Sequence, residues 1–327
     1  MRVLLTGSSG RLGRVLAPRL VAAGHVVTGL DVVPGADTVA LGSVADRAFV
    51  DRVFADHGIE AVIHAGGLHQ PDMGRLPRSA FVETNVAGTL NLIEAAARAG
   101  HDRFLFTSTT SLMISAAIHQ GTGHRGAGHR GAGHAAAWID EDLAPLVPRN
   151  IYGVTKLAAE QLCRLAHLEH GIGVVVLRTG RFFAESATID GIGAENRMAN
   201  ELLHRRLTVE DAAEAHLVAL ERAPSLGFET LILSAPTPFV RGDCAALMTD
   251  AAALIARRFP DAPALYAARG WVLPRRIDRV YSAARSERLL GFRCRTDFRT
   301  LLDGMAGGAP LPFAAAEGVQ DRLLERC

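Results

Sequence analysis

Cysteine is scarce in this 327-residue chain, which excludes a disulfide framework and a cysteine-based zinc site. The four cysteines, Cys163, Cys244, Cys294 and Cys327, are scattered, and none lies close to another in sequence. Disulfide-rich folds and structural zinc sites both depend on closely spaced cysteines. We therefore expect reduced thiols and no bound metal.

Long apolar runs and an excess of charge of one sign are also lacking. No uninterrupted apolar run approaches the roughly 18 residues that cross a bilayer. The 35 basic and 34 acidic side chains leave a net charge of +1, which gives no general attraction for nucleic acid or an acidic membrane. The balanced charge therefore favours a small-molecule substrate. Because the first apolar run starts directly at Val3, we expect a cytoplasmic protein.

The composition is that of a folded enzyme-sized protein. Hydrophobic residues make up 49% and charged residues 21% of the chain, which excludes disorder over the whole length. The length predicts about two domains, or one large domain with a smaller lobe.

Short apolar runs alternate with helical patterns in the first half of the chain. Such alternation predicts an α/β fold, a doubly wound parallel sheet of the Rossmann type, because parallel strands need helical crossovers. We expect a nucleotide-binding domain over 1–178, with a strand near 229–234 returning to it, and a smaller, mostly helical lobe over 179–327. The predicted strands are 3–6, 26–30, 38–41, 61–64, 104–106 and 174–177; the predicted helices are 81–99, 151–166, 195–205 and 210–222.

A glycine-rich turn follows the first predicted strand. Gly7, Gly10 and Gly13 let the backbone turn tightly and approach a pyrophosphate, while the next helix offers free amides and its positive dipole end. Asp31 ends the next strand, 18 residues after Gly13. A carboxylate there binds both adenosine ribose hydroxyls and repels a 2′-phosphate, so we expect NAD as the cofactor.

The chain contains a single lysine, and it follows a tyrosine at helical spacing. Lys156 follows Tyr152 by four residues, so both lie on one face of a predicted helix. With three tyrosines in the chain, chance would give this spacing in about one percent of random placements. We expect the ammonium to lower the phenol pKa, so that Tyr152 can act as acid and base.

A hydroxyl should complete this pair at the end of the fifth predicted strand. Five hydroxyl residues run from Thr107 to Ser111. One of them would hydrogen-bond the substrate oxygen that Tyr152 protonates or deprotonates.

With these residues assembled, the sequence resembles the extended short-chain dehydrogenase/reductase superfamily, of the NAD-dependent epimerase/dehydratase type. The resemblance covers about residues 1–235 and includes the motifs at 6–13, 62–66, 85–89, 106–109, 152–156 and 209–212. It implies that Thr109 is the catalytic hydroxyl, Tyr152 the acid/base and Lys156 its activator. It also implies a homodimer formed through the helices 81–99 and 151–166.

The resemblance also implies a cofactor-binding set, in which His69 stands where some members place a basic residue near the phosphates. The set is Gly7, Ser9, Gly10, Arg11, Leu12, Gly13, Asp31, Ser43, Val44, Ala65, Gly66, Gly67, His69, Asn85, Thr107, Tyr152 and Lys156.

Three departures from the family pattern bear on the substrate. Ser43 replaces the usual aspartate near the adenine, and Thr110 and Ser111 replace the acidic residues of the dehydratases. Arg181 replaces an asparagine that touches substrate in epimerases. With Thr109 and Thr110 we take Arg181 as a candidate substrate residue, which could clamp a carboxylate or instead serve as an internal ion-pair partner.

These features predict hydride transfer at a secondary alcohol or ketone of a sugar, sugar acid or similar hydroxylated molecule. The short span from Arg181 to Thr208 favours a dehydrogenase. A sugar-nucleotide epimerase is the first alternative, and a non-catalytic dinucleotide sensor is the second. A Gly-His-Arg repeat over 121–134 is typical of a solvated insertion, and metal binding is the less favoured interpretation.

Overall fold

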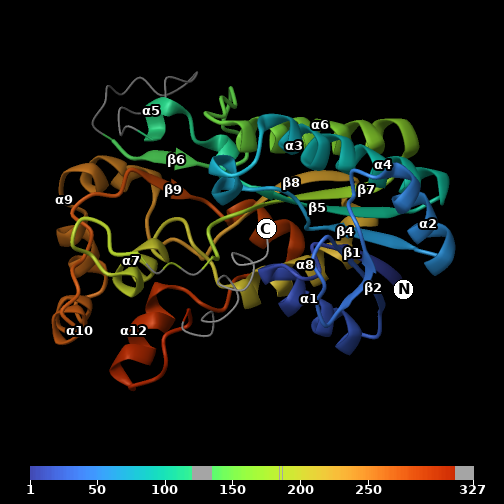
Figure 1. Cartoon of the computed structure of the whole chain (residues 1–327). Helices are drawn as coiled ribbons and strands as arrows, with labels where there is room; N and C mark the ends of the chain where they lie inside the picture. Colours follow the sequence, from blue (N-terminus) through green and yellow to red (C-terminus); the bar gives the residue numbers. More distant parts are fainter. Residues whose placement is uncertain (120–134, 184, 186, 314–327) are drawn as a thin grey trace.

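Seven parallel strands form the central sheet, in the order β3-β2-β1-β4-β5-β7-β8. The computed structural model describes residues 1–119, 135–183, 185 and 187–313 (Figure 1). All six strands predicted in the first 178 residues are present, and the strand expected near 229–234 pairs with β7. The strands are β1 (Arg2–Thr6), β2 (Val26–Asp31), β3 (Thr38–Leu41), β4 (Ala61–His64), β5 (Arg103–Thr109), β7 (Gly173–Thr179) and β8 (Phe228–Leu233).

Helices cover both faces of this sheet (Figure 1). Leu4 and Leu5 are adjacent in β1, yet they belong to two different hydrophobic clusters, because successive strand residues point to opposite faces. One cluster packs under α1 (Arg11–Ala22) and α8 (Val209–Leu226). The other packs under α2 (Arg47–His57), α4 (Gly88–Arg98) and α6 (Ile151–His170). The doubly wound prediction is therefore confirmed.

The remaining elements gather beyond the carboxyl ends of β5 and β7 (Figure 1). There β6 (Ala137–Ile139) pairs in parallel with β9 (Arg279–Tyr281). A third hydrophobic cluster joins α7 (Ala194–Glu201), α9 (Cys244–Arg258), α10 (Ala262–Ala268) and α12 (Phe298–Ala306). In the part of the chain that the structure describes, no helix is both long and apolar enough to span a bilayer.

The chain passes between sheet and lobe more than once after residue 178. Both α8 and α11 (Ala284–Leu290) pack against elements of the sheet domain, and β8 completes the sheet. The start of α8 has the cap that its sequence suggests, since Thr208 Oγ1 accepts a hydrogen bond from the Asp211 amide at 3.1 Å. The chain already reaches the lobe at β6, before the predicted boundary at 178, so the two parts are not consecutive along the sequence.

The single helix predicted over 81–99 requires correction. The structure has a short helix α3 (Arg78–Phe81), a π-helical turn η2 (Val82–Ala87) and then α4. A π turn inserts a residue into the helical ladder and often carries a functional side chain. Here it carries Asn85, whose buried amide bonds to two other segments. The helix predicted over 195–205 is also shorter than expected and ends at Glu201.

Candidate active site

The glycine-rich turn between β1 and α1 is a close backbone approach. Gly7 has φ +74°, and a Cβ built on it would lie 2.7 Å from the Gly66 amide nitrogen. A Cβ on Gly13 would lie 2.2 Å from the Gly7 carbonyl oxygen. The first turn of α1 follows Gly10 without a side-chain cap, so its amides are available to an anion. These features fit a bound pyrophosphate.

Asp31 ties the end of β2 to the same turn. Its Oδ2 accepts a hydrogen bond from the Ser9 amide at 3.0 Å, and its Oδ1 accepts one from the Val33 amide at 3.1 Å. The Ser9 hydroxyl donates to the Val33 carbonyl at 2.7 Å. The carboxylate is thereby oriented beside the phosphate turn, where adenosine ribose recognition requires it.

The other predicted cofactor residues near the turn have mixed surroundings. Arg11 is partly buried, and its Nε has no hydrogen-bond partner among the described residues, while Leu12 packs into the core under α1. Ser43 Oγ accepts a hydrogen bond from the Ala45 amide at 3.2 Å. Val44 is buried against the start of α4, where a Cβ on Gly88 would lie 2.6 Å from its methyl. Any contact of Leu12 with a cofactor therefore runs through its backbone.

A buried histidine that the sequence did not single out as functional links the turn to the π turn. His64 Nδ1 lies 2.7 Å from Thr6 Oγ1, and His64 Nε2 lies 3.0 Å from Thr89 Oγ1. Thr89 donates its hydroxyl proton to the Asn85 carbonyl, so it must accept from Nε2–H. Burial, with Lys156 adding to it, lowers the pKa of His64 to about 3. His64 is therefore a neutral connector between the two turns.

Asn85 holds the segment that follows β4. Its Oδ1 accepts a hydrogen bond from the Leu68 amide at 2.8 Å, and its Nδ2 donates to the Leu68 carbonyl at 2.9 Å. The same Nδ2 donates to Thr155 Oγ1 on α6 at 3.1 Å. A Cβ on Gly67 would approach Asn85 Oδ1 to 2.9 Å. Ala65, Gly66 and Gly67 are thus fixed between the phosphate turn and α6.

Tyr152 and Thr109 meet at the carboxyl end of β5. Burial raises the pKa of Tyr152 to about 12, a hydrogen bond with Thr109 opposes that rise, and the Asp72 carboxylate adds to it. Thr109 Oγ1 also accepts from the Ser111 amide at 3.1 Å. Of the hydroxyls in 107–111, Thr109 is the one bonded to the phenol.

Lys156 lies one helical turn after Tyr152, but its ammonium is directed toward β5. Its Nζ donates to the Thr107 carbonyl at 2.7 Å and lies 3.9 Å from the centre of the Phe106 ring. Burial lowers the pKa of Lys156 to about 8, against the raising effects of Cys163 and Glu160. In this arrangement the pKa of Tyr152 is raised, which is opposite to the direction expected from the sequence, because burial outweighs the hydrogen bond with Thr109.

The hydroxyls on either side of Thr109 have other partners. Thr107 Oγ1 lies 2.8 Å from Nε2 of buried His216, and Thr110 Oγ1 donates to the Thr179 carbonyl at 3.2 Å. Ser108 Oγ donates to Glu160 at 2.6 Å. Glu160 is four residues after Lys156 and forms a buried two-bond pair with Arg178. These contacts hold β5, α6 and β7 together beneath the phenol.

Arg181 belongs to a cluster of ion pairs. Its Nη1 lies 3.2 Å from Glu201 Oε1 and also contacts Glu185. Glu201 is buried and also binds Arg205 and Arg206 at 2.6 and 2.8 Å. Burial alone would raise the pKa of Glu201, but the three arginines lower it to about 2. Of the two interpretations that the sequence left open, the structure shows Arg181 as an internal ion-pair partner and not as a free clamp for a carboxylate.

His69 lies between Asp72 and Phe183. Its Nδ1 lies 3.1 Å from Asp72 Oδ2, and its ring meets the Phe183 ring edge-on, with centroids 5.4 Å apart. Its position near cofactor phosphates stays a prediction. The Gly-His-Arg repeat lies outside the described residues.

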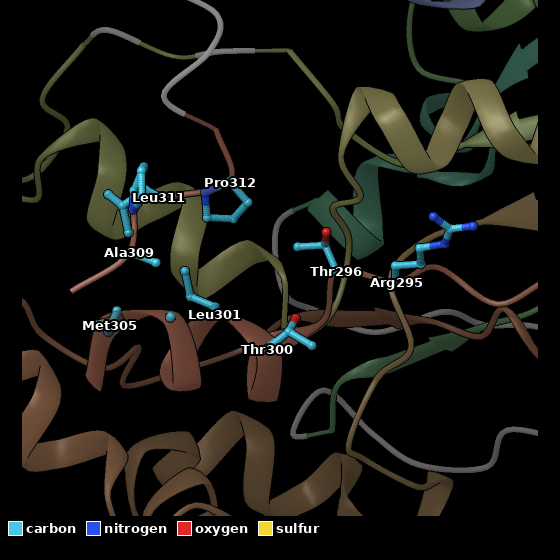
Figure 2. A pocket seen from close by; sticks show the side chains of 10 residues that line it. Arg295, Thr296, Thr300, Leu301, Met305, Ala309, Leu311 and Pro312 are labelled. Carbon is cyan, nitrogen blue, oxygen red and sulfur yellow. The ribbon is translucent and has the colours of Figure 1, made fainter. Parts of the chain in front are cut away.

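The described surface also has two hollows, one apart from the predicted site residues and one that adjoins them. The one in Figure 2 lies between α12 and residues 309–312, and is lined by Thr296, Thr300 and Leu301 among others. The second adjoins the starts of α1 and α8 and is lined by Arg11, Phe182 and Glu210 among others. The hollow in Figure 2 contains none of the predicted catalytic residues.

Comparisons with known proteins identify the family. The model of the NAD dependent epimerase/dehydratase family matches residues 3–227. This chain belongs to that family. It is an NAD-dependent enzyme of the extended short-chain dehydrogenase/reductase type, as the sequence predicted.

Relatives include enzymes with different reactions. The chain is 34% identical to a UDP-glucose 4-epimerase of Azospirillum brasilense over 186 residues, 54% of this chain and 48% of that enzyme. It is 28% identical to the L-arabinose 1-dehydrogenase (NAD(P)(+)) of Haloferax volcanii over 222 residues, 67% of this chain and 82% of that enzyme. The match thus spans about half the length of the Azospirillum epimerase.

Solved structures share the whole fold. A Thermus thermophilus UDP-glucose 4-epimerase in complex with NAD has a TM-score of 0.61 at 21% identity, with 94% of this chain and 100% of that chain covered. An Agrobacterium tumefaciens short-chain dehydrogenase/reductase superfamily protein with bound NAD has a TM-score of 0.64 at 22% identity, with coverages of 99% and 98%.

Proposed function

We propose that the chain is an NAD-dependent epimerase of a sugar nucleotide. The observation that carries this proposal is the Thr109–Tyr152 hydrogen bond at the end of β5, with Lys156 one turn later and the glycine turn at the same carboxyl edge of the parallel sheet. Support for epimerisation comes from relatives named UDP-glucose 4-epimerase in Azospirillum brasilense and Streptomyces lividans.

In this proposal each residue has a separate task. When bound, NAD would supply reversible hydride transfer at the substrate carbinol carbon. Tyr152 removes the hydroxyl proton during oxidation and returns a proton to the oxygen during reduction, while Thr109 hydrogen-bonds that oxygen. Lys156 holds the Thr107 carbonyl at the end of β5. The glycine turn and the amides of α1 would hold the pyrophosphate, and Asp31 the ribose.

A sugar dehydrogenase is the second candidate. The sequence favoured a dehydrogenase. Two observations still support it: the short segment from Arg181 to Thr208, and the relative named L-arabinose 1-dehydrogenase, which is matched over 82% of its length. Oxidation of a sugar acid loses support because Arg181 already pairs with Glu201 and Glu185. Dehydration is not proposed, since Thr110 and Ser111 carry no carboxylate for elimination.

The test uses purified chain with NAD and two substrates, UDP-glucose and L-arabinose. An epimerase converts UDP-glucose into UDP-galactose without stoichiometric release of NADH. Stoichiometric NADH formation with L-arabinose instead would overturn the epimerase proposal in favour of the dehydrogenase. Binding of NAD without turnover of either substrate would favour a non-catalytic dinucleotide sensor.

We also propose that two copies associate through α4 and α6. These helices pack together on one face of the sheet and leave apolar side chains exposed, among them Leu90, Val154 and Leu168. Exposed apolar patches of this kind often mark protein interfaces. Small-angle scattering at several concentrations should give twice the 34.7 kDa chain mass, and a monomeric mass throughout would contradict the proposal.

A further inference from the structure

A carboxylate outside the predicted catalytic set lies on a segment that packs against the helix of Tyr152. Asp72 belongs to a short 3-10 helix η1 (Gln70–Gly74), which packs against α6, the helix that carries Tyr152. The Asp72 charge acts on Tyr152 and raises the pKa of the phenol. The two groups therefore share one side of the site.

The position of Asp72 is held from three directions. Asn85 binds both the amide and the carbonyl of Leu68 and links that segment to Thr155 on α6. Asp72 Oδ2 accepts a hydrogen bond from the His69 amide at 2.8 Å. The His69 ring lies between Asp72 and the exposed Phe183 ring. Asp72 is thus linked to α6 through Asn85 and to Phe183 through His69.

Only one oxygen of Asp72 is used by these contacts. Within the described residues, Oδ2 accepts from His69, and Oδ1 accepts no hydrogen bond. The side chain is 23% exposed. An ionised carboxylate oxygen has lone pairs for two donors, so Oδ1 can accept a proton donor that enters the site.

The carboxylate also has a cost for the chemistry. A negative charge near Tyr152 disfavours the phenolate that removes the substrate proton. Within its own segment Asp72 meets the His69 amide and the His69 ring through Oδ2. A donor from the substrate would meet the carboxylate at Oδ1.

We propose that Asp72 Oδ1 accepts a hydrogen bond from the substrate hydroxyl next to the carbinol that Tyr152 and Thr109 hold. Asp72 is then a specificity-determining residue that selects a vicinal diol on a neutral sugar ring and repels a carboxylate at that position. This inference rests on the proposed action on a sugar, and it adds which hydroxyl group of the sugar is recognised.

Hydrogen bonds to a charged acceptor discriminate strongly against analogues that lack the donor. We expect the chain to prefer UDP-glucose over its 3-deoxy analogue, or L-arabinose over its 2-deoxy analogue, by about 10- to 100-fold in kcat/KM. In Asp72→Asn this preference should shrink to a few-fold, through a higher KM for the hydroxylated substrate. The deoxy substrate should be affected little, since it makes no such bond.

The matched control is Asp56→Asn, which alters an exposed carboxylate on α2 and should leave the preference unchanged. An unchanged preference in Asp72→Asn would overturn the proposal. An equal loss for both substrates would also overturn it, because that result indicates a bracing role for η1.

A binding measurement separates this inference from the proposed function. Calorimetric titration of the Tyr152→Phe chain, loaded with NAD, measures sugar affinity without turnover. Discrimination between hydroxylated and deoxy sugar that disappears in the Asp72→Asn background supports the inference, and discrimination that survives overturns it alone. If none of these sugars binds, both the sugar-directed function and the inference are wrong.

Discussion

The cofactor side and the substrate side of the site are held by different kinds of contact. Around Gly7 and Gly13 the backbone approaches itself so closely that a Cβ would fall within 2.7 Å of neighbouring backbone atoms. Around Glu201 the segments are joined by ion pairs with Arg181 and Arg206. The first arrangement depends on the absence of side chains, and the second on charged side chains whose partners must all be present.

This difference affects how each side tolerates change. A glycine turn fails by steric overlap, which is independent of pH and salt. A buried ion-pair cluster fails when one partner is removed, because the remaining charges are left without compensation in a poorly solvated place. The predicted catalytic residue Tyr152 belongs to neither arrangement: it bonds to Thr109 on the sheet, and the charge of Asp72 on η1 acts on its phenol.

The largest effect is expected at Tyr152, which belongs to neither group of contacts. Tyr152→Phe removes the acid/base group while keeping the ring, so kcat should fall about 10²- to 10⁴-fold. The affinity for NAD, measured by fluorescence titration, should stay near the wild-type value. Normal turnover by this variant on a genuine substrate would contradict the mechanism.

The chain offers a matched control for this substitution. Tyr266 is buried in the lobe, and within the described residues its hydroxyl has no hydrogen-bond partner. Burying an unpaired hydroxyl is unfavourable, so Tyr266→Phe should leave kcat unchanged and should not destabilise the chain. The contrast separates loss of the catalytic hydroxyl from loss of any tyrosine hydroxyl.

The second effect breaks the substrate side. Glu201→Gln leaves three arginines without their shared carboxylate, so the free energy of unfolding should fall by roughly 3–5 kcal/mol in urea titrations. Because the folded pKa of about 2 lies below the ordinary 4.5, this stabilisation is present above about pH 4.5 and is lost as the pH falls toward 2. Glu195→Gln, at an exposed position in the same helix, should change stability by less than about 0.5 kcal/mol. Equal values for the two variants would show that the cluster contributes nothing.

The third effect breaks the cofactor side. Gly13→Ala places a methyl group 2.2 Å from the Gly7 carbonyl oxygen, so the turn must shift, at a cost of about 1–3 kcal/mol in stability. Calorimetry should also show weaker NAD binding. Gly242→Ala introduces a methyl with no atom within 4 Å and should change neither quantity. Wild-type NAD affinity in Gly13→Ala would mean that the turn does not hold the pyrophosphate.

The sequence predicted the elements around the glycine turn far better than the contacts around Glu201, for the same physical reason. Glycine spacing and strand periodicity are local, so β1, α1 and the position of Asp31 follow from a few neighbouring residues. The Tyr152 and Lys156 spacing is local too. The direction of the Lys156 ammonium was not predictable, because it depends on the Thr107 carbonyl of a strand 49 residues away in sequence.

The substrate side depends on contacts that no local pattern reveals. Glu201 stands 20 residues from Arg181, and nothing in either segment indicates the pairing. Asp72 was missed for the same reason, since its relation to Tyr152 exists only after η1 packs on α6. The π turn at Asn85 was missed because a continuous apolar periodicity over 81–99 hides one inserted residue.

The smallest effect sharpens the link between the two turns that carry Thr6 and Asn85. The direction of each hydroxyl proton requires His64 to be neutral, with the proton on Nε2. Since its folded pKa is about 3, nitrogen NMR should show an unchanged neutral ring between about pH 8 and about pH 5. Thr89→Val removes the acceptor of that proton and should shift the Nε2 resonance, while the other histidines keep theirs. A His64 ring that gains a second proton above pH 5, or carries its single proton on Nδ1, would show that Nε2 does not donate to Thr89. The Asn85 turn would then be positioned by its bonds to Leu68 and Thr155 alone.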